Sequence, residues 1–234
     1  PSDHLACNKS VWDAMPPITH RTLVCDVPIS RELNDLMNSV DDGLMTGVPS
    51  MHRDDDSYAE AFNKQDPALA TIRRLLGLAK IPTVCAEICT RIADGHGPIL
   101  VGAWHTEVID ELVALLQKEG NRVMKLDGRS SSRQKVQAQD MFNEGKLDVL
   151  VGQIAAMGVS LNLQKGGNRI IIAEQDWSPA VMDQFYGRLH RMGQKKPVNV
   201  ETIVSDTKID KAISRISKTK SREHARIMAT DITV

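Results

Sequence analysis

Two arginines and a glutamine lie close together in the stretch DQFYGRLHRMGQ, residues 183–194. Gln184, Arg188 and Arg191 are spaced i, i+4 and i+7, so on a helix they would share a stripe about 60° wide. The rigid guanidinium fork suits phosphate or carboxylate. Spacing alone favours a structural ion pair with an Asp or Glu elsewhere in the fold, and a phosphate site is the alternative.

The element that must position these side chains is predicted to be a helix. Ser178 is a good N-cap, Pro179 a good first helical residue and Gly193 a stop signal. An apolar stripe lies about 100° from the arginines, and it consists of Val181, Phe185, Leu189 and Met192. The arginines therefore flank a buried face, where an unpaired charge is costly and an anionic partner is needed.

Other candidate residues lie in turns. In DGRSSS, Gly128 permits a tight turn, and Ser130 and Ser131 lie at the start of a helix that Ser131 and Gln134 open as a capping box. That arrangement holds a phosphate or is an ordinary cap. In GQIAAMGVSLNL, Gly158 lets the backbone approach either a ligand or a neighbouring element. His105 and Trp177 are interpreted as structural residues.

The pattern of elements predicts an α/β fold. Apolar strands are expected at 18–27, 98–103, 122–128, 147–152, 168–174 and 198–204. Helices are expected at 29–40, 67–95 (two pieces meeting at Ile81-Pro82), 107–120, 131–145 and from about residue 208, with an acidic loop at 41–66. This alternation indicates a parallel sheet with helices on both faces. Its ligand site should follow the strands' carboxyl ends, after Ala103, Leu126, Gly152 and Glu174.

Composition bounds the class of protein. The 234 residues are 41% hydrophobic and 25% charged with a net charge of −1, as in a globular protein, and no apolar run approaches the ~20 residues that span a bilayer. Four cysteines without a Cys-x-x-Cys pair favour a reducing, intracellular compartment and no metal site. Residues 1–60 carry 4 Lys/Arg and 11 Asp/Glu, whereas residues 188–226 carry 11 and 4, so the basic end could face a polyanion. The start at Pro1 suggests a processed chain or an excised piece.

The order of three segments carries a family resemblance. LDGRSSSRQKVQAQDMFNEG, VLVGQIAAMGVSLNL and RIIIAEQDWSPAVMDQFYGRLHRMGQ together resemble the C-terminal RecA-like lobe of superfamily-two helicases, and more narrowly the Swi/Snf-like double-stranded-DNA translocases. Their hallmarks are a Trp-Asn-Pro turn and a closing His-Arg-Ile-Gly-Gln, which here read 177–179 (Trp-Ser-Pro) and 190–194 (His-Arg-Met-Gly-Gln). AKIPTVCAEI and IIAEQDW lean toward the HARP-like annealing-helicase branch. The resemblance covers about residues 14–216, with departures at Ser178, Ser160, Arg129 and Lys135.

The resemblance implies a RecA-like lobe, 96–205, between an N-terminal extension, 1–95, and a basic C-terminal helix and tail, 206–234; both appendages are expected to be helical. It implies that Arg188 and Arg191 are arginine fingers for ATP, that Gln184 and Gly158 line the ATP cleft, and that the DNA backbone meets Gly128, Ser130, Ser131 and Gln153. ATP and Mg²⁺ would be held mainly by a separate N-terminal RecA-like lobe, because this sequence has no Gly-x-x-x-x-Gly-Lys-Ser/Thr and no Asp-Glu strand end. The chain alone is expected to be inactive.

The expected partners are therefore double-stranded or branched DNA and that second lobe, without a membrane, in the cytoplasm and nucleoid or in the nucleus. Two other functions stay open. One is a non-catalytic helicase-like module that binds DNA or protein, against which the intact arginine pair argues. The other is an RNA helicase lobe, which would usually end this motif in His-Arg-x-Gly-Arg rather than with Gln194.

Overall fold

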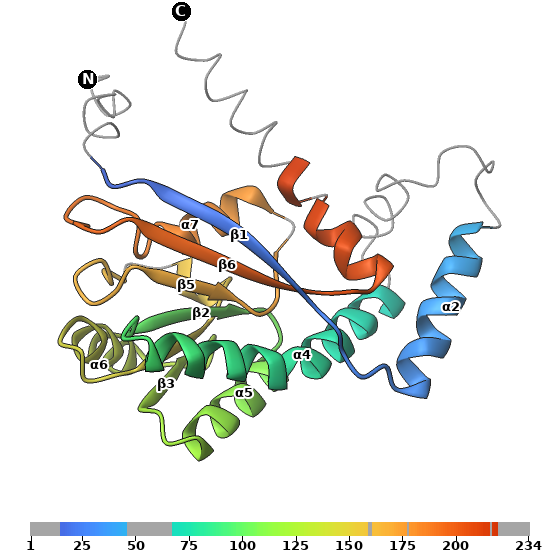
Figure 1. Cartoon of the computed structure of the whole chain (residues 1–234), viewed down its shortest axis with the longest axis horizontal. Coiled ribbons are helices and arrows are strands. Elements are labelled where there is room, and N and C mark those ends of the chain that lie inside the picture. Colours follow the sequence, from blue (N-terminus) through green and yellow to red (C-terminus); the bar gives the residue numbers. More distant parts are fainter. Residues whose placement is uncertain (1–14, 46–66, 159–160, 177, 216, 220–234) are drawn as a thin grey trace, which may run out of the picture.

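The strands form one parallel sheet. The computed structural model describes residues 15–45, 67–158, 161–176, 178–215 and 217–219. Six strands lie in the order β1-β6-β5-β2-β4-β3, and every neighbouring pair is parallel (Figure 1). Their bounds are β1 (Ile18–Cys25), β2 (Ile99–Ala103), β3 (Val123–Leu126), β4 (Val149–Gln153), β5 (Arg169–Ile172) and β6 (Val198–Ser205). The predicted α/β parallel-sheet fold is confirmed.

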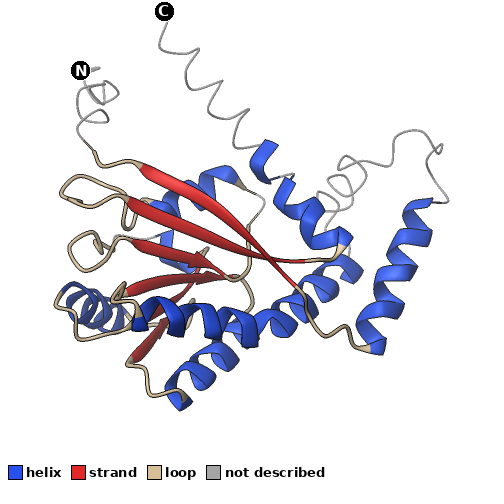
Figure 2. Cartoon of the chain, viewed as in Figure 1, coloured by secondary structure: helices blue, strands red, loops and turns tan. Residues whose placement is uncertain are grey.

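Helices cover both faces of the sheet (Figure 2). Successive strand residues point to opposite faces, so Val101 and Val151 pack against α4 and α5, whereas Leu100 and Leu150 pack against α6 and α7. All four of these side chains are fully buried, as expected for a sheet with two covered faces. The bounds are α2 (Arg31–Met45), α4 (Pro67–Ala93), α5 (Thr106–Lys118), α6 (Ser132–Asn143), α7 (Pro179–Tyr186) and the 3₁₀ turn η1 (Ala156–Gly158), with further helical residues at 208–215 and 217–219.

Two helix boundaries differ from the predictions. The break at Ile81-Pro82 was wrong, because α4 runs through Pro82 as one helix of 27 residues. Pro82 is exposed, while Ile81, Val84 and Ile88 are buried against the sheet, so packing outweighs the ~3 kcal/mol that an internal proline costs. Helix α2 runs to Met45, into the segment assigned to the acidic loop; the rest of that loop, 46–66, lies outside the described residues.

The two ends of the described chain meet along one edge of the sheet. Strand β1 pairs with β6 in register, from Ile18 opposite Val198 to Cys25 opposite Ser205. The last helix starts near residue 208 as predicted, and the Thr207 hydroxyl caps it, 3.3 Å from the backbone N–H of Asp210. The division at residues 95 and 205 stays a prediction. Within the described part of the chain, no helix combines the length and hydropathy needed to cross a bilayer.

Candidate functional site

The two arginines lie in a loop rather than on a helix, which corrects the prediction. Helix α7 ends at Tyr186 with Gly187 as its C-cap. Arg188 and Arg191 follow in successive turns, and only Gln184 lies on the helix. Met192, which was expected in the buried stripe, is 68% exposed. Residues 187–194 are called the arginine loop below.

The helix ends early because tertiary contacts take over its backbone groups. The carbonyl of Arg188 accepts from the N–H of Leu163 at 3.1 Å, so it is engaged outside the helix. The N–H of Arg188 and that of Leu189 bond three residues back, to Phe185 and Tyr186, as in a tightening last turn. Leu189 is fully buried and anchors the turn in the core.

A second segment, residues 161–167, runs beside the arginine loop and is bonded to it repeatedly. Arg188 Nη1 lies 3.5 Å from the carbonyl of Leu161, and Arg191 Nη1 donates to the side-chain oxygen of Asn162. Farther along, Gln164 Nε2 donates to the carbonyl of Met192 at 3.4 Å. We call the two segments together the paired loops. These bonds hold both guanidiniums against the segment between β4 and β5, which also contains Gly158.

The two guanidiniums repel each other electrostatically. Partial burial lowers the pKa of Arg188, and the positive charge of Arg191 lowers it further. Because the pKa of an arginine ordinarily lies far above neutral pH, this lowering leaves Arg188 charged. Within the described residues, Arg191 bonds to the amide oxygen of Asn162 and makes no ion pair. Arg188 has further interactions, so the structural ion-pair hypothesis stays open for it. Two neighbouring cations form a place where an anion is stabilised.

Gln184 and Gly158 are the other residues predicted to face ATP. Gln184 is exposed at the end of α7, and its carbonyl accepts from Arg188 Nε at 3.0 Å. Gly158 closes η1 directly after β4, and residues 159–160 lie outside the described chain. The bond from Arg188 to the Gln184 carbonyl places Gln184 beside the arginines. Gly158 is placed only by its position between β4 and β5.

The predicted DNA contacts lie at the carboxyl ends of strands β2, β3 and β4. The side chain of Gln153 bridges these turns, accepting from the N–H of Gly128 at 3.1 Å and donating to the carbonyl of Trp104 at 3.1 Å. Ser130 Oγ accepts from the N–H of Asp127 at 3.0 Å. Ser131 caps α6, and its capping box with Gln134 is confirmed. The described structure thus joins Gly128 to Gln153 and uses both hydroxyls in local bonds.

A buried carboxylate that the sequence analysis missed ties β2 to β5. Glu174 is 5% exposed, and its Oε2 accepts from the N–H groups of Trp104 and His105, both at 2.9 Å. Its Oε1 lies 2.7 Å from His105 Nδ1, so His105 is hydrogen bonded, as expected of a structural residue. Arg73 from α4 stacks 5.7 Å from the ring centroid of Trp104. The only signal in the sequence is an acidic residue closing an apolar strand.

The turn before α7 depends on Asp176 rather than on the predicted serine cap. The Ser178 side chain makes no capping bond, and Ser178 N–H instead donates to Asp176 Oδ1 at 2.6 Å. Burial raises the pKa of Asp176, which is 4% exposed. Pro179 takes its predicted place in the first turn of α7. Trp177 lies outside the described residues.

Comparison with known proteins identifies the domain. Residues 79–193 match the model described as the helicase conserved C-terminal domain. The Helicase SWR1 of Debaryomyces hansenii is 31% identical over 144 residues, which are 61% of this chain and 9% of that protein. The DNA repair and recombination protein RAD54-like of Drosophila erecta is 31% identical over 123 residues, 52% of this chain and 16% of that protein. Residues 79–193 of this chain therefore resemble a helicase C-terminal domain, and its relatives include a SWI/SNF-related protein of Mus musculus.

Solved structures share the fold of this helicase C-terminal domain. The C-terminal part of the Fun30 ATPase domain has a TM-score of 0.68 at 17% identity, covering 87% of this chain and 89% of that one. The Sulfolobus solfataricus SWI2/SNF2 ATPase core domain has a TM-score of 0.63 at 17% identity, covering 98% and 47%. These likenesses show the RecA-like fold. The matched part of this chain spans between 8% and 16% of the length of its curated relatives, which include the SWR1 and RAD54-like proteins. The HARP-like assignment stays a prediction.

Arg129, a departure from the family pattern, is held by acids on the helicase domain's surface. Its Nε donates to Asp127 Oδ2 at 2.9 Å, and its Nη2 lies 3.2 Å from Asp110 Oδ1. Hydrogen bonding to Arg129 lowers the pKa of Asp127. Hydrogen bonding to Lys125 is the largest cause that lowers the pKa of Asp110. These acids neutralise a cation beside the predicted DNA contacts at Gly128.

Arg129→Gln is expected to make this helicase domain unfold at a higher pH during acid titration. Because the folded pKa of Asp127 is depressed, its stabilising contribution is present above the unfolded value of about 3.9 and is lost as pH falls through the folded pKa. Without Arg129 the folded pKa rises toward that value, so the variant lacks most of this contribution above pH ~4, has a lower free energy of unfolding there, and reaches its acid midpoint at a higher pH. Circular dichroism against pH measures the midpoint. Arg133→Gln, an exposed change on the first turn of α6, is the matched control, and equal midpoints in both variants would contradict the account.

Proposed function

We propose that this domain is the C-terminal motor lobe of an ATP-dependent double-stranded-DNA translocase. The observation that carries the proposal is the arginine loop, in which Arg188 and Arg191 lie near each other on the paired loops. Two guanidiniums in that position fit the γ-phosphate of ATP and the charge that develops on it during phosphoryl transfer. Gln184 and Gly158 line the same cleft.

ATP and Mg²⁺ are held mainly by an N-terminal RecA-like lobe, in the same or a partner chain. ATP supplies the phosphoryl group that is transferred to water. This chain's part is to place Arg188 and Arg191 and to close the cleft against solvent, and arginine fingers contribute roughly 10³–10⁵ in rate.

The DNA backbone meets the carboxyl edge of the sheet, at Gly128, Ser130, Ser131 and Gln153. Exposed backbone and hydroxyl groups at the start of α6 suit phosphates and carry no base readout. Relatives whose names refer to chromatin regulation or DNA repair support duplex DNA as the partner, and with it a nuclear or nucleoid location. Because DNA turns and ATP groups belong to one rigid sheet, closure on ATP moves both together.

Two other functions have weaker support. A binding-only module has no need of two adjacent guanidiniums, yet the paired loops retain both. An RNA helicase lobe is the other alternative, and the relatives in hand are named for chromatin and DNA repair rather than for RNA. The HARP-like annealing activity, fork regression and chromatin remodelling are specialisations of the same proposed motor.

The test is ATP hydrolysis by a protein that joins this domain to its N-terminal lobe. We expect duplex DNA to stimulate turnover more than single-stranded DNA or RNA of equal length. Stimulation by RNA alone would favour the RNA helicase function. An absence of turnover with all three nucleic acids, in a protein that binds ATP, would favour the non-catalytic module.

A further inference from the structure

Residues 164–167 and the end of the arginine loop border a hollow at the amino ends of the strands, whereas the predicted DNA contacts lie at their carboxyl ends. It has a volume of about 360 Å³ and is lined by residues 164–167 and 193–196. These segments lead into β5 and β6, whereas Gly128 and Gln153 follow the ends of β3 and β4. Because all strands of a parallel sheet run the same way, residues before the strands and residues after them lie at opposite ends of the sheet. The hollow is therefore separate from the contacts proposed above.

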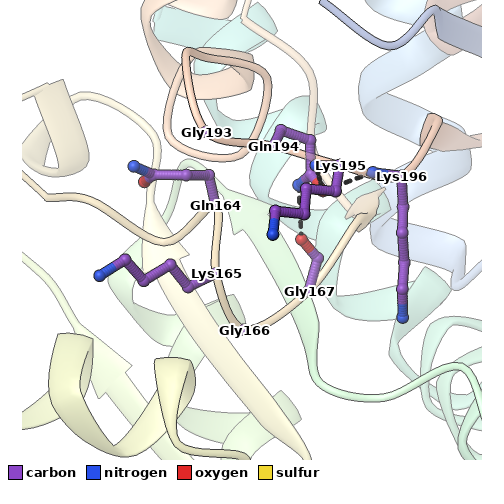
Figure 3. Close-up of a pocket in the computed structure, with 8 residues that line it drawn as sticks. All are labelled: Gln164, Lys165, Gly166, Gly167, Gly193, Gln194, Lys195 and Lys196. Carbon is purple, nitrogen blue, oxygen red and sulfur yellow. Dashed lines mark hydrogen bonds between the residues drawn. The ribbon is translucent and has the colours of Figure 1, made fainter.

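Three lysines surround this hollow, and their ammonium groups have no anionic partner among the described residues. Lys165, Lys195 and Lys196 are exposed, and within the described residues no hydrogen bond or ion pair engages their ammonium groups. By contrast, Lys80 lies 3.0 Å from Asp210, and Lys125 pairs with Asp110. Figure 3 shows Lys165 and Lys196 extending on opposite sides of the hollow, with Lys195 between them. Three unneutralised cations are gathered at one opening.

The backbone around the hollow is fixed by close packing. A Cβ added to Gly166 would lie 2.3 Å from the carbonyl oxygen of Phe142, and one on Gly167 would lie 2.4 Å from that of Pro98. Glycine is therefore required at both positions, and no side chain rises from this part of the wall. The two glycines let this segment pack directly on the backbone of Phe142 and Pro98, which fixes the wall of the hollow.

A buried glutamine holds two of the lysines in place. Gln194 is 8% exposed, and its Nε2 donates to the carbonyl of Gly167 at 2.9 Å, across the hollow (Figure 3). Its Oε1 accepts from the N–H groups of Lys195 and Lys196, at 2.9 and 3.0 Å. The backbone of both lysines is thus anchored, while their side chains remain free to move. In the opposite wall, Gln164 Oε1 is buried without a partner among the described residues.

We propose that this hollow binds the phosphodiester backbone of DNA, as a second contact in addition to the one proposed at the carboxyl ends of the strands. Lysines act as mobile point charges for phosphate, and three that spread from two neighbouring loops suit successive phosphates of a strand better than one compact ion. The inference rests on the proposed function for its choice of DNA. Gly193 is shared with the arginine loop, so this contact also reaches the segment that holds Arg191.

The test compares DNA binding by the two-lobe protein in two variants of equal charge. The first carries Lys165→Gln, Lys195→Gln and Lys196→Gln. The matched control carries Lys118→Gln, Arg21→Gln and Arg31→Gln, which are exposed on α5, β1 and α2. Fluorescence anisotropy with a labelled duplex at several salt concentrations gives the slope of log K against log salt. Removing one lysine–phosphate interaction makes that slope shallower by about 0.9, so the slope of the first variant should change by up to about 2.7 and that of the control far less.

Each outcome decides the inference. A shallower slope in the hollow variant alone supports it, and equal slopes in the two variants, or no DNA binding by the wild type at low salt, would overturn it. Inorganic phosphate and ATP are added as competitors, and displacement by millimolar phosphate in the wild type but not the hollow variant would mark a free-phosphate site instead. Thermal melting checks that both variants fold. If duplex-stimulated ATPase activity fails but the slope changes, the proposed function is wrong and this contact stands.

Discussion

Arg191→Ala is expected to lower DNA-stimulated ATP turnover by the two-lobe protein about a hundredfold or more, with ATP binding largely kept. The guanidinium would act on charge that develops only during phosphoryl transfer, so its loss raises the barrier more than it weakens the ground-state complex. Stopped-flow or steady-state phosphate release measures turnover, and a fluorescent nucleotide measures binding. Arg191 is well suited to this role because its described contact is with a neutral amide.

Three further variants separate catalysis from structure. Arg191→Lys keeps the charge without the fork, and should recover only part of the rate. Asn162→Ala removes the oxygen that holds Arg191, so a positioning role predicts a smaller fall in turnover with unchanged stability. Arg31→Ala, an exposed change on α2, is the neutral control. Turnover in Arg191→Ala above half of the wild-type value would show that this guanidinium has no catalytic part.

Glu174→Ala is expected to destabilise the isolated domain by roughly 3–5 kcal/mol, the usual cost of breaking a buried, charged network. The change removes the acceptor of two backbone N–H groups and of His105 Nδ1, and it removes a negative charge near the buried Arg73. Buried donors left unpaired cost about 1–3 kcal/mol each. Urea unfolding followed by circular dichroism gives the free energy of unfolding.

Two substitutions frame this measurement. Glu107→Ala removes an exposed carboxylate that pairs with Arg74 at 2.7 Å, and should cost less than about 1 kcal/mol. Glu174→Gln keeps an acceptor without the charge, and should fall between the two. If Glu174→Ala and Glu107→Ala have the same effect, the carboxylate does not tie β2 to β5 as described.

Most of the fold could be predicted because its signals are local. Continuous apolar runs such as PILVGA mark strands buried on both faces, and the capping box of Ser131 and Gln134 marks the start of α6. The failures occurred where tertiary contacts oppose local preference. Pro82 signals a break, yet apolar packing along α4 carries the helix through it. The Leu163 N–H that bonds the Arg188 carbonyl ends α7 early, and no local pattern announces it.

The candidate site was predicted in part for the same reason. Motif order located Arg188 and Arg191, and it placed Gly128 and Gln153 in neighbouring turns, where they are hydrogen bonded. Asn162 was missed because its role depends on a segment 29 residues away. Glu174 was missed because its partners follow a different strand, which only the sheet order β5-β2 brings near.

The most direct test of the account is ATP hydrolysis by this domain alone and by the same domain joined to its N-terminal lobe, each with and without duplex DNA. We expect no turnover above background from the domain alone, because in the proposed function the N-terminal lobe holds the phosphates and magnesium. We expect DNA-stimulated turnover when both lobes are present. Equal turnover by the domain alone, or none with both lobes and DNA, would contradict the claim that this chain completes an ATPase in combination with a second lobe.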